Sequence, residues 1–332
     1  MDHSRRIFIV TGAAGLTALA FRAQTAYAQP GASIGDASAA PTSAVVFGAP
    51  SGAHQPFLVR SADGTMLTGD AQGDPQAPEI LLIHGLRQSR LSWDKQFDDP
   101  ALAGFRMVRF DLRGHGDSDK PSSPDDYSDI DKWADDVAAV IAATKLRRPV
   151  LVGWSLGGWV AGGYLRKYGG AGIAGVNLVD AVTKLAPGLL TPLAGAFAQT
   201  GTSHELAART AATAEFLLAC FHQPPTGIDL QNMLVINGMT ARAANEGFIK
   251  TAVNDLEPVF AAYKGPILTS HGTHDRLVSL AMSQRIKALR PGNRLSVYAN
   301  SGHSPFYEEP ARFGRELAAF VAAASKWPVD RR

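Results

Sequence analysis

The segment GWSLGG (residues 153–158) places a serine between glycines, directly after the apolar run VLV. The following segment WVAGGYLRKY has helical spacing, so the serine lies where a strand gives way to a helix. A G-x-S-x-G sequence in this context is typical of a sharp, strained turn, on which side chains two residues to either side would collide. Gly153 and Gly157 remove those side chains. The pattern predicts that Ser155 is a nucleophile at a helix N-terminus, where free N–H groups favour developing negative charge.

Apolar runs of strand length recur along the chain, most of them short and bounded by Gly, Pro or Asp. They are FLV (57–59), ILLI (80–83), MVRF (107–110), VLV (150–152), VNLV (176–179), ILTS (267–270) and LSVY (295–298). Segments with helical spacing, such as residues 130–145 and 311–323, separate most of these runs. The alternation predicts an α/β fold with a mostly parallel central sheet and helices on both faces.

A base and an acid for Ser155 are available at two later strand ends. A serine hydroxyl is a weak nucleophile unless a histidine, itself oriented by a carboxylate, takes its proton. Asp275 follows ILTS in the segment HGTHDRLV, and His303 follows LSVY in ANSGHSPF. Functional sites of parallel sheets lie beyond the carboxyl ends of the strands. We therefore predict that Ser155, Asp275 and His303 act as nucleophile, acid and base, in the chain order expected for this architecture.

Several segments together resemble the α/β-hydrolase fold superfamily, over about residues 55–325. They are HGLRQSRLSW (84–93), FDLRGHGDSDKP (110–121), GWSLGG (153–158), HGTHDRLV (271–278) and SGHSPFYEEPARF (301–313). The resemblance implies an oxyanion hole built from the backbone N–H groups of Leu86 and Leu156. It also implies that Asp111 and His115 belong to a structural turn without a catalytic role. Asp180, which ends the strand VNLV, is a rival to Asp275 because some superfamily members place the acid there.

The segment between VNLVDA and GPILTS resembles the helical cap that many superfamily members carry over the active site. We predict a cap at residues 183–263 and a hydrolase core at residues 53–182 and 264–332. The apolar residues of the cap are expected partly to pack against the core and partly to line a substrate pocket. Trp154, next to the nucleophile, is expected to shape that pocket.

The arginines of the oxyanion loop leave two interpretations open. Arg87 and Arg90 could bind a substrate carboxylate, although exposed loop arginines are more often solvated. Cys220, in EFLLACFH, is interpreted as a buried small hydrophobic residue. A metal site from His84, His115, His271 and His274 lacks the ligand spacing that such sites use, so no metal is predicted. No G-x-G-x-x-G motif follows a strand and no P-loop is present, so no cofactor is predicted.

The first 28 residues resemble a twin-arginine export signal. They contain SRRIFI (4–9), an apolar stretch and the sequence Ala26-Tyr27-Ala28 before Gln29. Residues 29–52 are rich in Ala, Ser, Gly and Pro and are interpreted as a flexible leader. The apolar stretch is about 12 residues long, short of the roughly 20 that span a bilayer. We therefore expect a soluble periplasmic or secreted protein without a stable membrane span.

Composition limits the partners. The 332 residues are 45% hydrophobic and 19% charged, which is typical of a globular chain. Without the three arginines and one aspartate of residues 1–28, the 32 basic and 30 acidic residues become 29 of each. A neutral chain without a basic patch does not indicate a nucleic acid partner. The single cysteine excludes an intramolecular disulfide, and the oligomeric state is left undetermined.

The predicted reaction is acyl transfer from a small, apolar carboxylic ester to water. Dehalogenases and epoxide hydrolases of the superfamily carry Asp in place of Ser155, and the latter also need cap tyrosines, whereas the predicted cap holds only Tyr263 at its far end. Cofactor-free haloperoxidase or perhydrolase activity, C–C bond hydrolysis and lactonase activity remain alternatives on the same residues. Perhydrolases of the superfamily usually have a proline in the oxyanion loop, and C–C hydrolases commonly have Asn before the nucleophile. A non-catalytic binding protein of the same fold is the alternative from another class.

Overall fold

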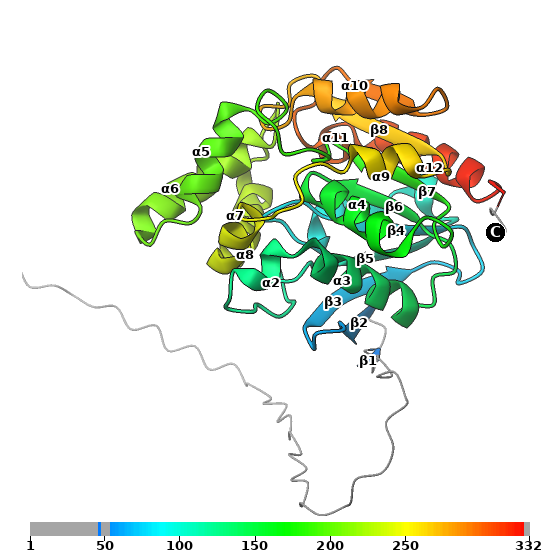
Figure 1. Cartoon of the computed structure of the whole chain (residues 1–332), viewed down its shortest axis with the longest axis horizontal. Helices are drawn as coiled ribbons and strands as arrows, with labels where there is room; N and C mark the ends of the chain where they lie inside the picture. The colour runs from blue at the N-terminus through cyan, green and yellow to red at the C-terminus, as the bar shows by residue number, and fades with distance from the viewer. Residues whose placement is uncertain (1–45, 48–53, 329–332) are drawn as a thin grey trace, which may run out of the picture. The chain divides into compact units, whose positions relative to one another are not determined.

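A single sheet of nine strands organises the part of the chain that the computed structural model describes, residues 46–47 and 54–328 (Figure 1). The strands are β1 (Val46–Phe47), β2 (Gln55–Arg60), β3 (Met66–Gln72), β4 (Glu79–Ile83), β5 (Arg106–Phe110), β6 (Val150–Trp154), β7 (Gly175–Val179), β8 (Ile267–Gly272) and β9 (Arg294–Tyr298). Their order is β1-β2-β3-β5-β4-β6-β7-β8-β9. The strands from β5 to β9 in this order pair in parallel, whereas β1, β2 and β3 pair antiparallel at one edge. The mostly parallel α/β sheet predicted from the sequence is confirmed.

Strand β3 was not predicted, and its sequence explains why. It reads MLTGDAQ, and Gly and Asp are both depleted in strands. Gly69 is required there because a Cβ atom would lie 2.2 Å from the ring of Phe57 on β2. Gly69 thus leaves room for the Phe57 ring of the neighbouring strand, a requirement that the residues of β3 alone do not reveal.

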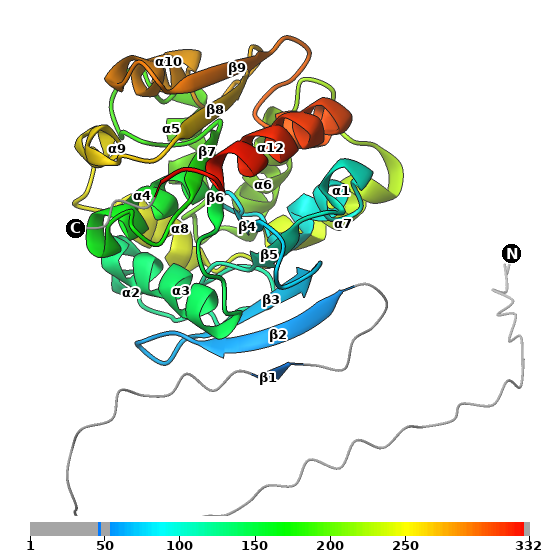
Figure 2. The ribbon, with the colours of Figure 1, turned by 90° about the vertical axis from the view of Figure 1, so that its right-hand side faces the viewer.

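Helices occupy both faces of the sheet, as predicted. Their bounds are η1 (Arg90–Trp93), α1 (Asp94–Phe97), η2 (Pro100–Leu102), α2 (Asp125–Ser128), α3 (Ile130–Ala143), α4 (Leu156–Tyr168), α5 (Pro192–Thr200), α6 (Leu206–Ala219), α7 (Gly227–Gly238), α8 (Arg242–Phe248), α9 (Glu257–Ala262), α10 (Leu280–Leu289), α11 (Pro305–Glu308) and α12 (Pro310–Ala324). Strand β4 alternates between two apolar cores: Leu81 and Ile83 join the core that contains α3, α4 and α10, and Ile80 and Leu82 join that of α1 and α12. Figure 2 shows α12 and α1 on the side of the sheet opposite α3 and α4.

The segment between β7 and β8 contains helices α5 to α9 and no named strand among its residues, all of which the structure describes. Figure 1 shows α5 to α8 grouped beside the sheet. Helix α9 contacts the core helices: a Cβ atom on Gly162 of α4 would lie 3.0 Å from the ring of Phe260, and Glu257 accepts from Arg285 of α10 at 2.7 Å. Helix α9, the last helix of the predicted cap (residues 183–263), therefore packs against the helices that cover the sheet.

Parallel pairing brings the ends of distant strands to one edge of the sheet. Five chain segments leave that edge after β4, β6, β7, β8 and β9. They carry Leu86, Ser155, Asp180, Asp275 and His303 in that order. Sites of parallel sheets form at this edge.

Most of the N-terminal predictions concern residues that the structure does not describe. The predicted export signal, residues 1–28, lies outside the described residues. So does the predicted leader, 29–52, except that residues 46–47 form β1 and pair with β2. No helix within the described residues has the length and apolar character to cross a membrane.

Candidate active site

Ser155 lies on a strained turn between β6 and α4. Its φ of 53° and ψ of −114° are unfavourable for a residue with a side chain. A Cβ atom on Gly153 would lie 2.5 Å from the carbonyl oxygen of Gly157, the collision across the turn that the sequence predicts. A Cβ atom on Gly157 would instead lie 2.3 Å from the carbonyl oxygen of Ile83, so this glycine lets the turn approach β4. Such strain persists only where the surroundings impose the conformation.

Backbone hydrogen bonds to the end of β7 hold this turn. The Ser155 N–H donates to the carbonyl oxygen of Val179 at 2.9 Å, and the Ser155 carbonyl accepts from the N–H of Val182 at 2.9 Å. The following residue begins α4, so Ser155 occupies the N-terminus of a 13-residue helix. The helix dipole there favours negative charge at the serine oxygen and at a bound carbonyl oxygen.

Asp275 and His303 form a buried acid–base pair. Asp275 Oδ2 lies 2.7 Å from His303 Nδ1, and both side chains are almost fully buried. Asp275 Oδ1 accepts from the N–H groups of Leu277 and Val278 at 2.7 and 3.0 Å, which fixes the carboxylate. No hydrogen bond joins His303 to Ser155 among the residues that the structure describes. The hydrogen bonds of catalytic groups commonly tighten only when substrate is bound.

Trp154 links the turn that carries Ser155 to the loop that carries His303. It does not line the cavity at Ser155. Its indole N–H donates to the backbone carbonyl of His303 at 2.6 Å, and its ring packs against Phe306 with centroids 4.8 Å apart. It belongs to the core on the α12 face of the sheet. Since consecutive strand residues point to opposite faces, the expectation that its ring shapes the acyl pocket is corrected. Trp154 instead positions the loop that carries His303.

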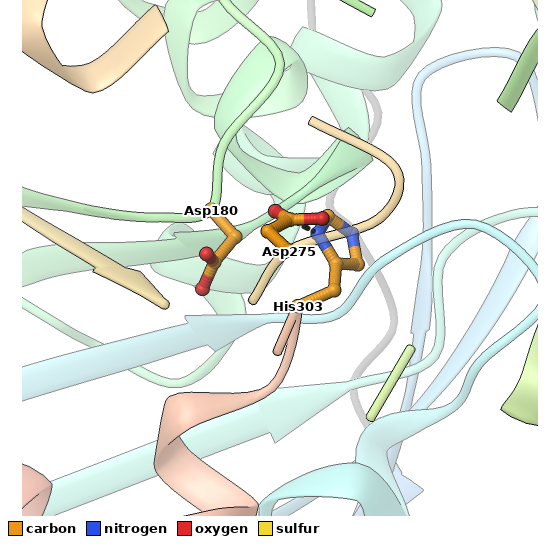
Figure 3. A group of neighbouring side chains, drawn as sticks. All are labelled: Asp180, Asp275 and His303. Atoms are coloured by element: carbon orange, nitrogen blue, oxygen red, sulfur yellow. Dashed lines mark hydrogen bonds and ion pairs between the residues drawn. The ribbon is translucent and has the colours of Figure 1, made fainter. Parts of the chain in front are cut away.

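Asp180, the rival acid, lies next to this pair (Figure 3). Oxygen and nitrogen atoms of Asp180, Asp275 and His303 lie within 4.8 Å of one another, and the three residues are the only group of potential metal ligands found among the described residues. Asp180 has a left-handed φ of 42°, its Oδ1 accepts from the N–H of Gly272 at 2.9 Å, and its buried Oδ2 has no hydrogen-bond partner in this part of the chain. His303 is hydrogen-bonded to Asp275, not to Asp180.

The pKa values of the two carboxyl groups are shifted in opposite directions. Burial raises the pKa of Asp180 well above its ordinary value, and the nearby charge of Asp275 raises it further. Burial also opposes ionisation of Asp275, but its contact with His303 outweighs this and lowers the pKa. The opposite directions of these two shifts favour a proton on Asp180 and ionisation of Asp275. This distribution places the carboxylate charge against the histidine.

The predicted oxyanion donors lie on the wall of the same cavity as Ser155. Within the described residues, neither the Leu86 N–H nor the Leu156 N–H donates to another protein group. His84 was not predicted to have a role here, but its Nδ1 lies 2.7 Å from the Gly85 carbonyl oxygen and its Nε2 accepts from the Leu112 N–H at 3.0 Å. Burial lowers the pKa of His84 to about 4, so the ring is neutral and Nδ1 donates.

This histidine orients one of the two predicted oxyanion donors. The Gly85 carbonyl and the Leu86 N–H belong to one planar trans peptide unit and point in opposite directions. The hydrogen bond from His84 therefore fixes the direction of the Leu86 N–H. No sequence pattern around His84 indicates this function, because it depends on the Leu112 N–H from a different strand end.

An apolar cavity of about 430 Å³ opens at Ser155. Most of its wall comes from the segment between β7 and β8, including Leu190, Phe197, Phe216 and Phe248. Mostly apolar cavities of this size with a few polar groups are typical small-molecule sites. Tyr263 lies elsewhere: it is buried, and its hydroxyl donates to the Ile173 carbonyl.

The arginines of the oxyanion loop are not solvated. Arg90 forms ion pairs with Asp70, Asp111 and Asp117, and these contacts build the turn after β5. Arg87 is only 3% exposed, lines the cavity and forms no ion pair among the described residues. Both arginines had the same two interpretations from the sequence, but only Arg87 is free of carboxylate partners within the described residues and lines the cavity.

The other histidines of the rejected metal site contact neighbouring protein groups, and the cysteine is buried. His115 Nδ1 donates to the Arg113 carbonyl at 2.8 Å. His271 contacts Ser283 Oγ at 2.9 Å, and His274 stacks on His222. Cys220 is buried, as predicted.

Comparison with known proteins establishes the family. The family model for the alpha/beta hydrolase fold matches residues 78–310, and the chain belongs to this family. It is 30% identical to the AB hydrolase superfamily protein YisY of Bacillus subtilis, over 73% of this chain and 90% of that protein.

Two further similarities come from proteins whose names state an activity. The crystal structure of a candidate aryl esterase from Burkholderia cenocepacia is 37% identical, with a TM-score of 0.78 over 82% of this chain and all of that one. The bifunctional esterase/perhydrolase DCH of Acinetobacter calcoaceticus is 28% identical, over 79% of this chain and 98% of that protein.

The shared proton of the two carboxyl groups predicts a pH effect on stability. Above the ordinary Asp pKa of 3.8, folding of the wild type requires Asp180 to bind a proton that the unfolded chain has lost. The contribution of Asp180 to the free energy of unfolding therefore falls as pH rises, by up to about 1.4 kcal/mol per pH unit below its raised pKa. Asp180→Asn keeps the acceptor for the Gly272 N–H and removes this dependence. Urea unfolding from pH 4 to 8 should show the variant gaining stability relative to wild type as pH rises.

The control is Asp98→Asn, which makes the same change of charge at an exposed position. A constant difference between Asp180→Asn and wild type across this pH range would contradict the assignment of the proton to Asp180.

Proposed function

We propose that the chain is a serine hydrolase that cleaves carboxylic esters through an acyl-enzyme intermediate. The observation that carries the proposal is the position of Ser155. It lies on a strained turn in the wall of an apolar cavity, near a buried histidine–carboxylate pair and beside two backbone N–H groups that have no protein partner among the described residues. The similarity to proteins named as a candidate aryl esterase and an esterase/perhydrolase supports the same reaction.

In the first half of the reaction, Ser155 Oγ attacks the ester carbonyl carbon and His303 accepts the hydroxyl proton. Ionised Asp275 stabilises the resulting imidazolium and keeps Nδ1 protonated. The carbonyl oxygen becomes an oxyanion that accepts hydrogen bonds from Leu86 and Leu156 N–H. The bond to the leaving alkoxide then breaks, and His303 returns the proton to it, so an alcohol departs.

In the second half, water attacks the acyl carbon while His303 takes its proton. The second tetrahedral intermediate collapses, the proton returns to Ser155 Oγ, and the carboxylic acid leaves. The apolar wall of the cavity favours substrates with apolar groups close to the ester.

Perhydrolysis is a second candidate, favoured by the similarity to the bifunctional enzyme DCH. Hydrogen peroxide would replace water in the second half and release a peracid from the same acyl-enzyme. The absence of proline from residues 84–93 is the difference from the perhydrolase pattern. Lactones and C–C bonded substrates would use the same serine, whereas a binding protein would turn over none of them.

We also propose that the chain is exported through the twin-arginine route to the periplasm or beyond the cell. The support is SRRIFI, the apolar stretch after it and the Ala26-Tyr27-Ala28 sequence. In a bacterial host with this route, wild type should be recovered outside the cytoplasm with Gln29 as its first residue. Replacing Arg5 and Arg6 together by lysine should leave the precursor in the cytoplasm. Equal export of the two proteins would contradict the proposal.

Hydrolysis of p-nitrophenyl esters of two to twelve carbons tests the proposed reaction. We expect wild type to show rates that depend on chain length, since the cavity is finite. Ser155→Ala should lower kcat by about 10³-fold or more at unchanged fold, because removal of a triad nucleophile leaves only binding and oxyanion stabilisation. Parallel assays with peroxide measure peracid formation. Equal rates for both proteins with every ester would overturn the ester hydrolase proposal.

A further inference from the structure

A second cavity, which we call the cap cavity, lies against Arg87. It has a volume of about 430 Å³ and is lined by side chains of α6, α7 and α8, including Arg209, Asn237 and Arg242. Arg87 lines both this cavity and the apolar cavity at Ser155. Three arginines, Arg87, Arg209 and Arg242, line the cap cavity, whereas Arg87 is the only one of them that lines the apolar cavity.

Arg87 is a buried cation without an anionic partner among the described residues. Its Nε donates to Asn245 Oδ1 at 3.0 Å and its Nη2 to the Phe197 carbonyl at 2.9 Å, both neutral acceptors. Its Nη1 is buried and has no hydrogen-bond partner among the residues that the structure describes. Burial lowers the pKa of Arg87 to about 10, so the side chain remains charged near neutral pH. Buried charges are normally paired, because an isolated one is costly to desolvate.

Other polar groups around the cap cavity also lack partners. The amide nitrogen and oxygen of Asn237, a residue only 3% exposed, make no hydrogen bond within the described chain, nor does Thr240 Oγ1. Both residues line the cap cavity with Arg87. Since buried polar groups in native proteins are nearly always satisfied, these atoms together indicate a polar occupant.

The charge balance makes that occupant an anion. Arg209 donates to the Ser203 carbonyl at 3.3 Å, a neutral group. Arg242 contacts Glu246 and His204. The ion pair with Glu246 neutralises one of the three arginines. The cap cavity therefore keeps an excess of positive charge beside unpartnered donors.

We propose that the cap cavity and Arg87 bind a carboxylate carried by the substrate, so that the preferred ester is one with a second, free carboxyl group. The inference rests on the proposed ester hydrolase function. Arg87 immediately follows the predicted oxyanion residue Leu86, and it lines both the apolar cavity at Ser155 and the cap cavity. The apolar cavity holds the hydrocarbon that connects the two groups. The unpartnered Nη1 of Arg87 can donate a charge-assisted hydrogen bond to a carboxylate oxygen.

Hydrolysis of a matched pair of esters tests the inference. The anionic ester is the mono-p-nitrophenyl ester of glutaric acid, and the neutral one is p-nitrophenyl pentanoate, with an acyl chain of the same length. We expect wild type to prefer the anionic ester in kcat/KM. Arg87→Met should lower kcat/KM for it by about 10- to 100-fold, the value of a hydrogen bond to a charged group, and change the neutral ester by less than about threefold. Arg87→Lys should restore part of the loss.

The control Arg276→Met removes the same charge from an exposed residue and should leave both esters unaffected. An equal loss of both esters in Arg87→Met would assign Arg87 a purely structural role. No preference of the wild type for the anionic ester would mean that only water occupies the cap cavity. Either result overturns the inference.

A binding measurement separates this inference from the proposed reaction. Calorimetric titration of Ser155→Ala with glutarate requires no catalysis and should show binding that is lost when Arg87→Met is added. Glutarate binding without ester hydrolysis by wild type would contradict the proposed reaction while leaving the anion site in place. Ester hydrolysis without glutarate binding would support the proposed reaction and contradict the anion site. Binding of inorganic phosphate in preference to glutarate would overturn the carboxylate assignment.

Discussion

The backbone conformation of Ser155 is the constraint on which the site depends. A φ of 53° in a residue with a side chain is held by hydrogen bonds to Val179 and Val182 and by the close approach of Gly157 to the end of β4. The parallel sheet supplies these contacts, since β4, β6 and β7 end at the same edge. The same turn begins α4, so the strain that exposes the serine also directs a helix N-terminus at it.

Electrostatics at the adjacent strand ends complements this geometry. Two buried carboxyl groups, Asp180 and Asp275, lie beside His303 and His271, and only Asp275 accepts a hydrogen bond from the His303 imidazole. Burial disfavours charge on both carboxyl groups, whereas the contact with His303 and the hydrogen bonds from the N–H groups of Leu277 and Val278 favour ionisation of Asp275. The neutral His84 fixes the peptide that carries the Leu86 N–H. Charge is thus arranged before any substrate is present.

Much of this arrangement could be predicted from the sequence, because strong local signals coincide with the sheet edge. The continuous apolar runs predicted seven strands, and the residues after them placed Ser155, Asp275 and His303 together. Properties that depend on partners distant in the chain were missed. Strand β3 relies on the Phe57 ring, and Trp154 points to the face opposite the cavity because consecutive strand residues alternate. The burial of Arg87 depends on contacts with α5 and α8, which no local pattern encodes.

In the proposed reaction the fold activates Ser155 as a nucleophile. The most direct test of this activation is the reaction of the protein with a fluorophosphonate, followed by mass measurement of the intact chain and of its peptides. We expect one covalent adduct, located on Ser155, whose formation slows strongly in His303→Ala. Absence of an adduct on Ser155, or labelling at an equal rate in the His303 variant, would contradict it.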